Sequence, residues 1–410
     1  MQKIVIIGGG ASGLVAAITA ARTGKKVTII EKNNIMGKKI LVTGNGRCNY
    51  FNQDQNIKHY KSENLELLEK IITRPNLDKV LEFFKEIGIE PKIKNGYYYP
   101  FSNQAVSIQN GLMSEIKNLD IEIKNNITVQ EVKKENNKFI ITTNEQNITA
   151  DKVIIATGSK AAPKTGSDGS GYEICKKLGH TIIKPLPALV QLKGNEKYFK
   201  EWNGIRADAS IELYEDNQKI GQDIGEIQLT DYGISGICVM NLSGRIARGL
   251  YEGKSEYVKI NFVEGLNLKT TQQFIEFMNK RNATMKNRTI SELLEGIINY
   301  KLVNVLLKKS KIAITTKWNQ LSEQQELELA KNIIELKINI IDTNSFDKSQ
   351  VCSGGIPLSE IDIDTMESQK TKGLYIIGEL LDVDGDCGGY NLTWAWISGM
   401  LAGKHVGEDF

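Results

Sequence analysis

The first 31 residues alternate between short apolar runs and a glycine-rich turn. Lys3–Ile7 is apolar and β-branched, which predicts a buried strand. The turn that follows reads GGGASG, and the alanine-rich segment at residues 14–23 predicts a helix that ends at Gly24. A second apolar run, Lys26–Ile30, predicts another strand and is followed directly by Glu31. The pattern therefore predicts a strand–helix–strand unit with an acid at the end of its second strand.

The far end of the chain repeats this order of elements. Residues 374–377 predict a strand that ends at Gly378 and Glu379, and a loop of acids and glycines follows at residues 382–391. Residues 392–402 predict a helix whose small side chains permit close packing against a neighbour. The N-terminus of such a helix carries free N–H groups, so we expect it to meet a ligand.

Between these ends, residues 152–155 predict one further buried strand, which leaves through Ala156, Thr157 and Gly158. Three runs before it, at residues 121–124, 128–133 and 138–143, predict a meander. The glycine-rich stretch GSDGSGY at residues 166–172 follows no strand, and we expect it to form a loop.

From residue 188 onward the pattern changes to short alternating strands. The runs at residues 189–192, 207–213, 227–229 and 258–262, separated by turn residues, predict a small β domain. Three capping-box patterns follow and predict helices at residues 271–286, 290–309 and 323–336. They pair Thr270 with Gln273, Thr289 with Glu292 and Ser322 with Gln325. Residues 338–341 predict a strand that returns to the β domain.

Composition narrows the class of protein. The chain has 410 residues, 40% hydrophobic and 25% charged, as in ordinary globular proteins, and its net charge of +3 is too small for a nucleic-acid footprint. Five widely spaced cysteines without a CxxC pair argue against a disulfide scaffold, a zinc site or a dithiol centre, and the three histidines suggest no metal site. No signal peptide and no apolar run of membrane-spanning length is recognisable. We expect a cytoplasmic protein without metal, nucleic-acid or membrane partners.

The first glycine turn indicates a dinucleotide. Gly8 permits the tight turn, Gly10 lets the backbone approach a pyrophosphate, and Gly13 lets helix and strand pack closely. Glu31, 18 residues after Gly13, is placed to bind ribose hydroxyls, which favours FAD or NAD over NADP. No second GxGxxG unit exists for a nicotinamide cofactor. The alternative is a tight turn without a ligand.

A flavin gives the C-terminal loop a role. Reduced flavin carries negative charge near N1 and the C2 carbonyl, which a helix N-terminus stabilises. Asp384 or Glu379 can hold ribityl hydroxyls, and Gly388 and Gly389 let the backbone lie close to the ring. Val129 is a candidate for backbone contact with the adenine. The alternative here is an ordinary strand-to-helix loop with a cap.

Eight motifs together resemble one bacterial flavoprotein family, variously labelled YhiN-like, BaiN-like and aminoacetone-oxidase-like. They are GGGASGL, GKKILVTGNGRCN, YYYPFSNQA, ATG, GSDGSGY, LTDYGISG, SGGIPLSEID and GLYIIGELLDVDGDCGGYNLTWAWISG. The resemblance runs nearly end to end and implies an α/β fold with a discontinuous, Rossmann-like FAD domain of the glutathione-reductase type. An inserted β-barrel-like domain and a small helical domain interrupt it. The expected boundaries are residues 1–187 and 346–410 for the FAD domain, residues 188–266 and 337–345 for the β domain, and residues 267–336 for the helical domain.

The resemblance also implies the residues that surround the cofactor. Those expected at the adenosine and phosphate end are Gly8, Gly10, Ala11, Ser12, Gly13, Glu31, Lys32, Lys38, Lys39 and Val129. Ala156, Thr157 and Gly158, from the middle of the chain, are also expected to contact the cofactor. Those expected at the ribityl chain and the ring are Thr43, Gly44, Asn45, Gly46, Arg47, Cys48, Asn49, Gly378, Glu379, Asp384, Gly388, Gly389, Tyr390 and Asn391.

Two residues of the TGNGRCN loop have open roles. Arg47 can stabilise an anionic flavin or an anionic substrate. Cys48 lacks a histidine nearby in sequence and a resolving partner, so packing is the more common role for such a thiol than nucleophilic chemistry. Tyr97, Tyr99, Asp231 and Tyr232 are candidates for the walls of a substrate pocket between flavin and β domain. The alternative for the tyrosines is interface packing.

We therefore expect an FAD-dependent oxidoreductase that moves a hydride between flavin and a small or steroid-like substrate. An enone reductase with NADH or NADPH as transient donor is one form, and an amine oxidase that uses oxygen is another. A flavin-dependent tRNA-modifying enzyme and a flavin redox sensor are further alternatives. We expect a monomer or homodimer. The sequence assigns no catalytic acid or base.

Overall fold

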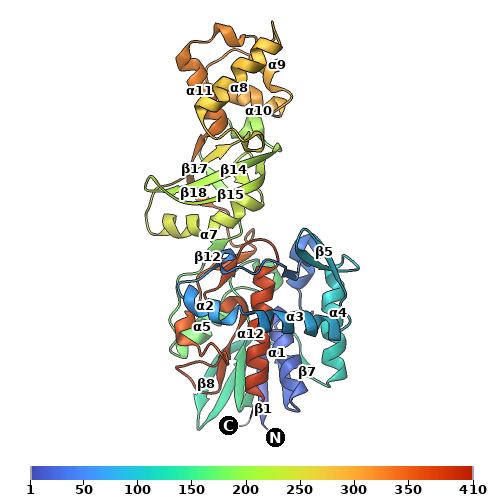
Figure 1. The fold of residues 1–410 in the computed structure, drawn as a ribbon. Helices are drawn as coiled ribbons and strands as arrows, with labels where there is room; N and C mark the ends of the chain where they lie inside the picture. Colours follow the sequence, from blue (N-terminus) through green and yellow to red (C-terminus); the bar gives the residue numbers. More distant parts are fainter. Residues whose placement is uncertain (1, 409–410) are drawn as a thin grey trace. The chain divides into compact units, whose positions relative to one another are not determined.

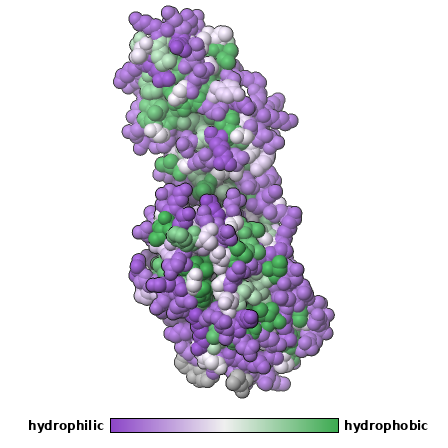
Figure 2. All heavy atoms as spheres, turned by 90° about the vertical axis from the view of Figure 1, so that its right-hand side faces the viewer, coloured by the Kyte–Doolittle hydropathy of each residue, from purple (hydrophilic) through white to green (hydrophobic). Residues whose placement is uncertain are grey.

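The structure, a computed structural model, describes residues 2–408 and divides into two compact units (Figure 1). The first unit contains the chain up to Leu186 and from Ser349 onward, and the second is Pro187–Lys348. On the face shown in Figure 2, hydrophilic side chains predominate and apolar side chains occur in scattered groups. Each unit has its own hydrophobic core.

The first unit is built on a five-stranded parallel sheet. Its order is β20 (Leu374–Ile376), β11 (Lys152–Ile155), β1 (Lys3–Ile7), β2 (Lys26–Ile30) and β7 (Glu122–Lys124). The apolar runs of the sequence form its central strands because both faces of a parallel sheet are covered. Strand β20, from the C-terminal part of the unit, thus pairs with β11 of the N-terminal part.

The expected meander was wrong in its first strand. β7 pairs in parallel with β2, with Ile123 opposite Ile29, and the antiparallel sheet contains only β8 (Val129–Glu135), β9 (Lys138–Thr143) and β10 (Asn147–Ala150). The reason is α4 (Ala105–Asn118), which supplies the crossover that a parallel strand requires. The stretch at residues 166–172 was also more than a loop, because α5 (Ser170–Lys177) begins inside it.

Within residues 2–186 and 349–408, six helices and several short elements complete the first unit. Besides α4 and α5 the helices are α1 (Ala11–Arg22), α2 (Leu65–Ile71), α3 (Arg74–Glu86) and α12 (Tyr390–Val406). The short elements are η1 (Ile40–Gly46), β3 (Phe51–Asn52), η2 (Ile57–His59), β4 (Tyr60–Lys61), β5 (Pro91–Lys94), β6 (Tyr97–Pro100), η3 (Pro163–Thr165), β19 (Val351–Ser353), η6 (Leu358–Glu360), η7 (Gly378–Leu380) and β21 (Asp384–Gly385). β12 (Leu186–Ala188) spans the residue at which the chain passes into the second unit.

The second unit contains a closed six-stranded barrel, which confirms the predicted β-barrel-like insertion. Its strands, in order around the barrel, are β13 (Leu192–Gly194), β16 (Gly233–Ser235), β15 (Gln218–Leu229), β14 (Arg206–Glu215), β17 (Glu256–Asn261) and β18 (Leu336–Thr343). β18 contains the returning strand predicted at residues 338–341. The strand expected at residues 189–192 is displaced to β13, because Leu189 has a left-handed backbone (φ +48°).

Helices cover the barrel and extend its core. α7 (Ile237–Tyr251), which the sequence analysis missed, buries Cys238, Leu242 and Ile246 at helical spacing. The other helices are α6 (Phe199–Trp202), α8 (Thr271–Thr284), α9 (Ile290–Leu294), α10 (Tyr300–Lys309) and α11 (Glu323–Ile334), with η4 (Glu264–Leu266) and η5 (Trp318–Gln320) between them. All three predicted capping boxes are confirmed. The single helix expected at 290–309 is two, because the side chain of Asn299 caps a new helix by accepting the Lys301 N–H at 3.0 Å.

Candidate functional site

The turn between β1 and α1 combines close packing with one open position. A Cβ on Gly8, whose φ is +107°, would lie 2.4 Å from the carbonyl oxygen of Ala156, and one on Gly13 would lie 2.0 Å from that of Gly8. A Cβ on Gly10 would meet no atom within 4 Å. Gly10 is also the N-cap of α1, and no side chain caps the helix there. The first turn, which starts at Ala11 and Ser12, therefore offers unpaired N–H groups to an anion.

Glu31 lies directly beneath this turn. Its buried carboxylate accepts the Gly9 N–H at 2.7 Å and both the backbone and side-chain N–H groups of Asn33, at 2.8 and 2.7 Å. The carbonyl of Glu31 accepts the N–H of Ile127 at 3.0 Å, which draws the chain leading to Val129 alongside. Lys32 forms an ion pair of 2.6 Å with Asp168. Glu31, Lys32 and the chain leading to Val129 thus lie together just after β2.

The first and last helices lie side by side and run in the same direction (Figure 1). A Cβ on Gly399 would lie 2.6 Å from the carbonyl oxygen of Ser12, and one on Gly403 would lie 2.5 Å from that of Ala16, so only glycine allows this approach. α12 starts nine residues before Gly399 and α1 one residue before Ser12. At about 1.5 Å per residue, the two N-termini are offset by about 12 Å along a shared direction.

The N-terminus of α12 is also uncapped by any side chain. It follows Gly388 and Gly389, whose φ angles of +139° and +96° suit glycine alone. Asn391, expected to face the cofactor, exchanges two hydrogen bonds with the backbone of Gly385, at 2.8 and 2.7 Å. Asp384 is buried in β21, opposite Lys61 of β4. Asn391 thus fixes the loop that precedes its own helix.

An ion pair connects the N-terminal and C-terminal parts of the first unit. The ammonium of Lys39 lies 2.7 Å from the carboxylate of Glu379, and the hydroxyl of Ser159 donates to the same carboxylate at 3.0 Å. Gly378, at the start of η7, is held by its N–H, which donates to Ser398 at 3.1 Å. Lys38 precedes Lys39 and is half-buried. The partners in the pair are 340 residues apart, so sequence spacing gave no sign of it.

The TGNGRCN loop has an unusual backbone. Gly44, Asn45, Gly46 and Cys48 all have positive φ angles, between +53° and +79°. Non-glycine residues rarely adopt this conformation, and Asn does so most readily. The loop turns back on itself, since the Cys48 N–H donates to the Thr43 carbonyl at 3.0 Å. Such a backbone directs several N–H groups to one side and suits an anion or a polar ring edge.

Two buried polar atoms near these loops lack partners within residues 2–408. They are Asn49 Oδ1, at the end of the TGNGRCN loop, and Thr157 Oγ1, just after β11. Asn49 Oδ1 lies 3.1 Å from the position of a Cβ on Gly389, so the two glycine loops meet. Gly158 follows in a left-handed conformation (φ +74°). Buried polar atoms are normally hydrogen-bonded, so these two oxygens have unused capacity to accept or exchange a hydrogen bond.

Cys48 has the environment of a packing residue. Its side chain is 0% exposed. Burial raises the pKa of its thiol from 9.0 to about 12, although a hydrogen bond with Thr43 opposes the shift. The thiolate is therefore scarce at neutral pH, and the thiol is not activated for nucleophilic chemistry.

The predicted pocket residues fall into two groups. Tyr97 and Tyr99 lie on one face of β6, and they approach the two glycine loops. The Tyr97 ring lies 2.9 Å from the position of a Cβ on Gly388, and the Tyr99 ring lies 3.8 Å from that of a Cβ on Gly44. Asp231 and Tyr232 belong to the second unit, where both are exposed in the turn between β15 and β16.

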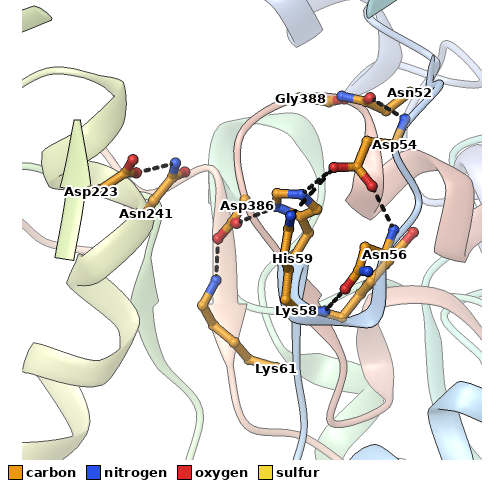
Figure 3. A network of polar contacts seen from close by, with 12 residues as sticks. Asn52, Asp54, Asn56, Lys58, His59, Lys61, Asp223, Asn241, Asp386 and Gly388 are labelled. Carbon is orange, nitrogen blue, oxygen red and sulfur yellow. Dashed lines mark hydrogen bonds and ion pairs between the residues drawn. The ribbon is translucent and has the colours of Figure 1, made fainter. Parts of the chain in front are cut away.

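The sequence analysis missed a polar network beside Gly388 (Figure 3). The two ring nitrogens of His59 lie 3.0 Å from the Asp386 carboxylate and 3.1 Å from that of Asp54, and Lys61 also pairs with Asp386. The His59 ring stacks on Tyr390, with centroids 4.7 Å apart. His59 and Asp386 are 327 residues apart in sequence, and no spacing signal connects them. The network fixes the loop from which α12 starts.

These features define a class of protein. Two parallel helices with uncapped N-termini, a glycine turn after the first strand and an acid after the second form the nucleotide-binding fold of FAD-dependent oxidoreductases. Within residues 2–408, no cluster of three or more potential metal ligands is present, and no helix is long and apolar enough to cross a membrane.

Comparison with known proteins confirms this class and the family. The protein-family model described as "HI0933-like protein Rossmann domain" matches residues 2–405, so the chain belongs to this family of FAD-dependent oxidoreductases. It is 41% identical over 410 residues, covering 100% of both chains, to the 3-dehydro-bile acid delta(4,6)-reductase of Clostridium scindens. It is 26% identical over 404 residues, 98% of this chain and 97% of the relative, to the ribosomal RNA dihydrouridine synthase of Escherichia coli.

A solved structure shares the fold. The 3-ketosteroid-delta4-(5alpha)-dehydrogenase of Rhodococcus jostii superimposes with a TM-score of 0.51 at 12% identity, over 100% of this chain and 97% of that chain. This similarity concerns the fold alone.

Proposed function

We propose that this protein is an FAD-dependent reductase of carbon–carbon double bonds conjugated to a carbonyl, acting on a small or steroid-like substrate. The observation that carries the proposal is the end-to-end similarity, 41% over 410 residues, to a reductase of 3-dehydro bile acids. Relatives over the full length that are named for steroid and for uridine reduction share one chemistry. Both reductions would add a hydride and a proton across a double bond next to a carbonyl.

The chain's own residues fit FAD in an extended position. The free N–H groups of α1 and the open space at Gly10 suit the pyrophosphate, and Glu31 suits the ribose. About 12 Å further along, the uncapped start of α12 suits the pyrimidine edge of the flavin ring. Asn49 lies beside Gly389 and Thr157 beside Gly8, and their unpaired side-chain oxygens would be available to hydrogen-bond the cofactor. Reduced FAD supplies the hydride.

The electron donor is tested first. We propose NADH or NADPH, which must act at the flavin itself because the chain has no second GxGxxG unit. The purified holoenzyme is mixed anaerobically with each, and the visible flavin absorbance is followed. Rapid bleaching supports a reductase. Bleaching by dithionite alone points to an oxidase or dehydrogenase reduced by its own substrate, with small amines tested next.

The acceptor is tested with the reduced enzyme. Anaerobic addition of a 3-oxo-Δ4 steroid acid is expected to restore the flavin absorbance and to remove the ultraviolet band of the enone. A flavin that stays reduced with this acid and is reoxidised only by oxygen overturns the proposal.

Reduction of uridine in ribosomal RNA is the second candidate. It is favoured by the full-length similarity to two proteins named ribosomal RNA dihydrouridine synthase, at 26% and 28% identity. Incubation of reduced enzyme with ribosomal RNA that lacks dihydrouridine, followed by mass spectrometry of its nucleosides, separates the two candidates.

A further inference from the structure

Arg47 is an exposed cation whose direction is fixed by its neighbours. Its Nε–H donates to the Gly44 carbonyl at 3.2 Å, and its guanidinium carbon lies 5.3 Å from the centroid of the Tyr99 ring. A guanidinium over an aromatic face is attracted by the ring and loses little further freedom on binding a ligand. The two terminal nitrogens of Arg47 remain available.

Its charge is not neutralised within residues 2–408. No carboxylate there lies within ion-pair distance of Arg47. The exposed or half-buried arginines elsewhere that do have acidic partners are Arg22 with Glu86 and Glu115, Arg74 with Asp78, Arg206 with Glu226, and Arg288 with Glu292. A fixed, uncompensated guanidinium is suited to a planar anion.

Arg47 lies at the edge of the candidate ring site. Tyr99, which holds it, shares a face of β6 with Tyr97, and Tyr97 lies against Gly388. The anionic groups of FAD already have places, since its phosphates fit the start of α1 and the reduced ring fits the start of α12. Arg47 is therefore left for a group that is not part of the cofactor.

From this placement we infer that Arg47 binds a carboxylate of the substrate and thereby selects small enones that carry an acid group. The inference rests on the proposed function and deepens it. A guanidinium binds a carboxylate through two parallel hydrogen bonds, so Arg47 acts through affinity and leaves the hydride step itself unchanged.

The test compares two substrates that differ by one charge. The probes are a 3-oxo-Δ4 bile acid with a free side-chain carboxylate and its methyl ester. For Arg47→Gln we expect the KM of the acid to rise about tenfold or more, with the kcat and the KM of the ester changed less than about twofold. Arg47→Lys keeps the charge without the fork and is expected to lie between. Arg74→Gln removes an exposed arginine of the same unit and serves as the matched control.

Two further readouts separate affinity from damage. Binding of acid and ester to the oxidised holoenzyme, which does not reduce them, is expected to show the same selective loss in Arg47→Gln. Tyr99→Leu removes the ring that holds the guanidinium. It is expected to raise the KM of the acid by a smaller factor than Arg47→Gln does, and by a larger factor than it raises the KM of the ester.

An equal rise in the KM of acid and ester in Arg47→Gln, or an unchanged KM for the acid, overturns the inference while the proposed function stands. Reduction of ribosomal RNA but of neither steroid also overturns it. If wild-type reduced enzyme reduces none of these probes, the failure lies with the proposed function.

Discussion

The Cys48 thiol is expected to be unreactive in the folded protein. Its pKa is raised from 9.0 to about 12 by burial, a difference of about three pH units. At pH 8 the thiolate fraction is then about 0.01%, compared with about 10% for an ordinary thiol of pKa 9, so alkylation slows by about a thousandfold. Lack of access to the 0% exposed side chain slows it further.

The assay is timed iodoacetamide labelling at pH 8 with mass spectrometry of the Cys48 peptide, in folded and in urea-unfolded protein. Cys387, which is half-exposed in the same unit, is the internal comparison. Labelling of Cys48 in the folded protein at a rate close to that of Cys387 would refute the reasoning. The same reasoning predicts that Cys48→Ala keeps its flavin and its turnover, with a loss of about 1 kcal/mol in stability. A variant with bound flavin but no turnover would show that the thiol takes part in the reaction.

Three further predictions concern the glycine turn, the buried Glu256 and the partly buried Glu360. Gly10→Ala should fold with unchanged stability but bind FAD at least tenfold more weakly, because its Cβ meets only the space proposed for the pyrophosphate. Gly13→Ala should lose folding stability, because its Cβ would lie 2.0 Å from a backbone oxygen. Flavin content and thermal melting curves of both variants test these two expectations. Glu256 is 3% exposed, and burial together with Glu215 raises its pKa from 4.5 to about 8, so its contribution to stability is intact below pH 4.5 and is lost as the pH rises to 8, at about 1.4 kcal/mol per pH unit. Glu256→Gln should therefore be more stable than wild type at pH 8 in urea unfolding and similar at pH 4, and equal stability at pH 8 contradicts this. The pKa of Glu360 falls to about 2, because hydrogen bonds with Lys370, Thr181 and His180 outweigh its burial. Its contribution to folding stability is therefore present above pH 4.5 and is lost as the pH falls toward 2. Glu360→Gln should make stability depend less steeply on pH in the acid range, and an unchanged dependence argues against this.

Local patterns were enough to predict the flavin-binding fold. The β1–α1–β2 unit, the C-terminal strand and helix, and the three capping boxes each depend on contacts within a few residues, which the sequence displays directly. The family resemblance then supplied the barrel and the discontinuous arrangement, both of which the structure confirms.

Errors in the predicted elements had both distant and local causes. The segment at residues 121–124 has the apolar pattern of any strand, and only the crossover through α4 makes it the parallel neighbour of β2. α7 was overlooked although its buried residues recur at helical spacing. The break between α9 and α10 depends on a cap at Asn299, which sequence alone presents as one more polar residue in a helical run.

The polar parts of the site were the least accessible to sequence reasoning. Lys39 with Glu379, and His59 with Asp386, join segments more than 300 residues apart. The hydrogen bonds between Asn391 and the backbone of Gly385 were not foreseen, because sequence does not show which backbone group a side-chain amide meets. The identity of the residues that contact FAD stays a prediction.

The packing of α1 against α12 has a consequence for the folding of the protein during its synthesis. Strand β20 and helix α12 complete a sheet and a core that begin with β1 and α1, whereas the second unit is one uninterrupted stretch, Pro187–Lys348. On the ribosome, the second unit can therefore fold before β20, which completes the sheet of the first unit, has been synthesised. The flavin site closes only after residues 374–406 have emerged, so cofactor uptake follows synthesis, and ribosomes stalled before that point should carry chains with a folded barrel and no flavin.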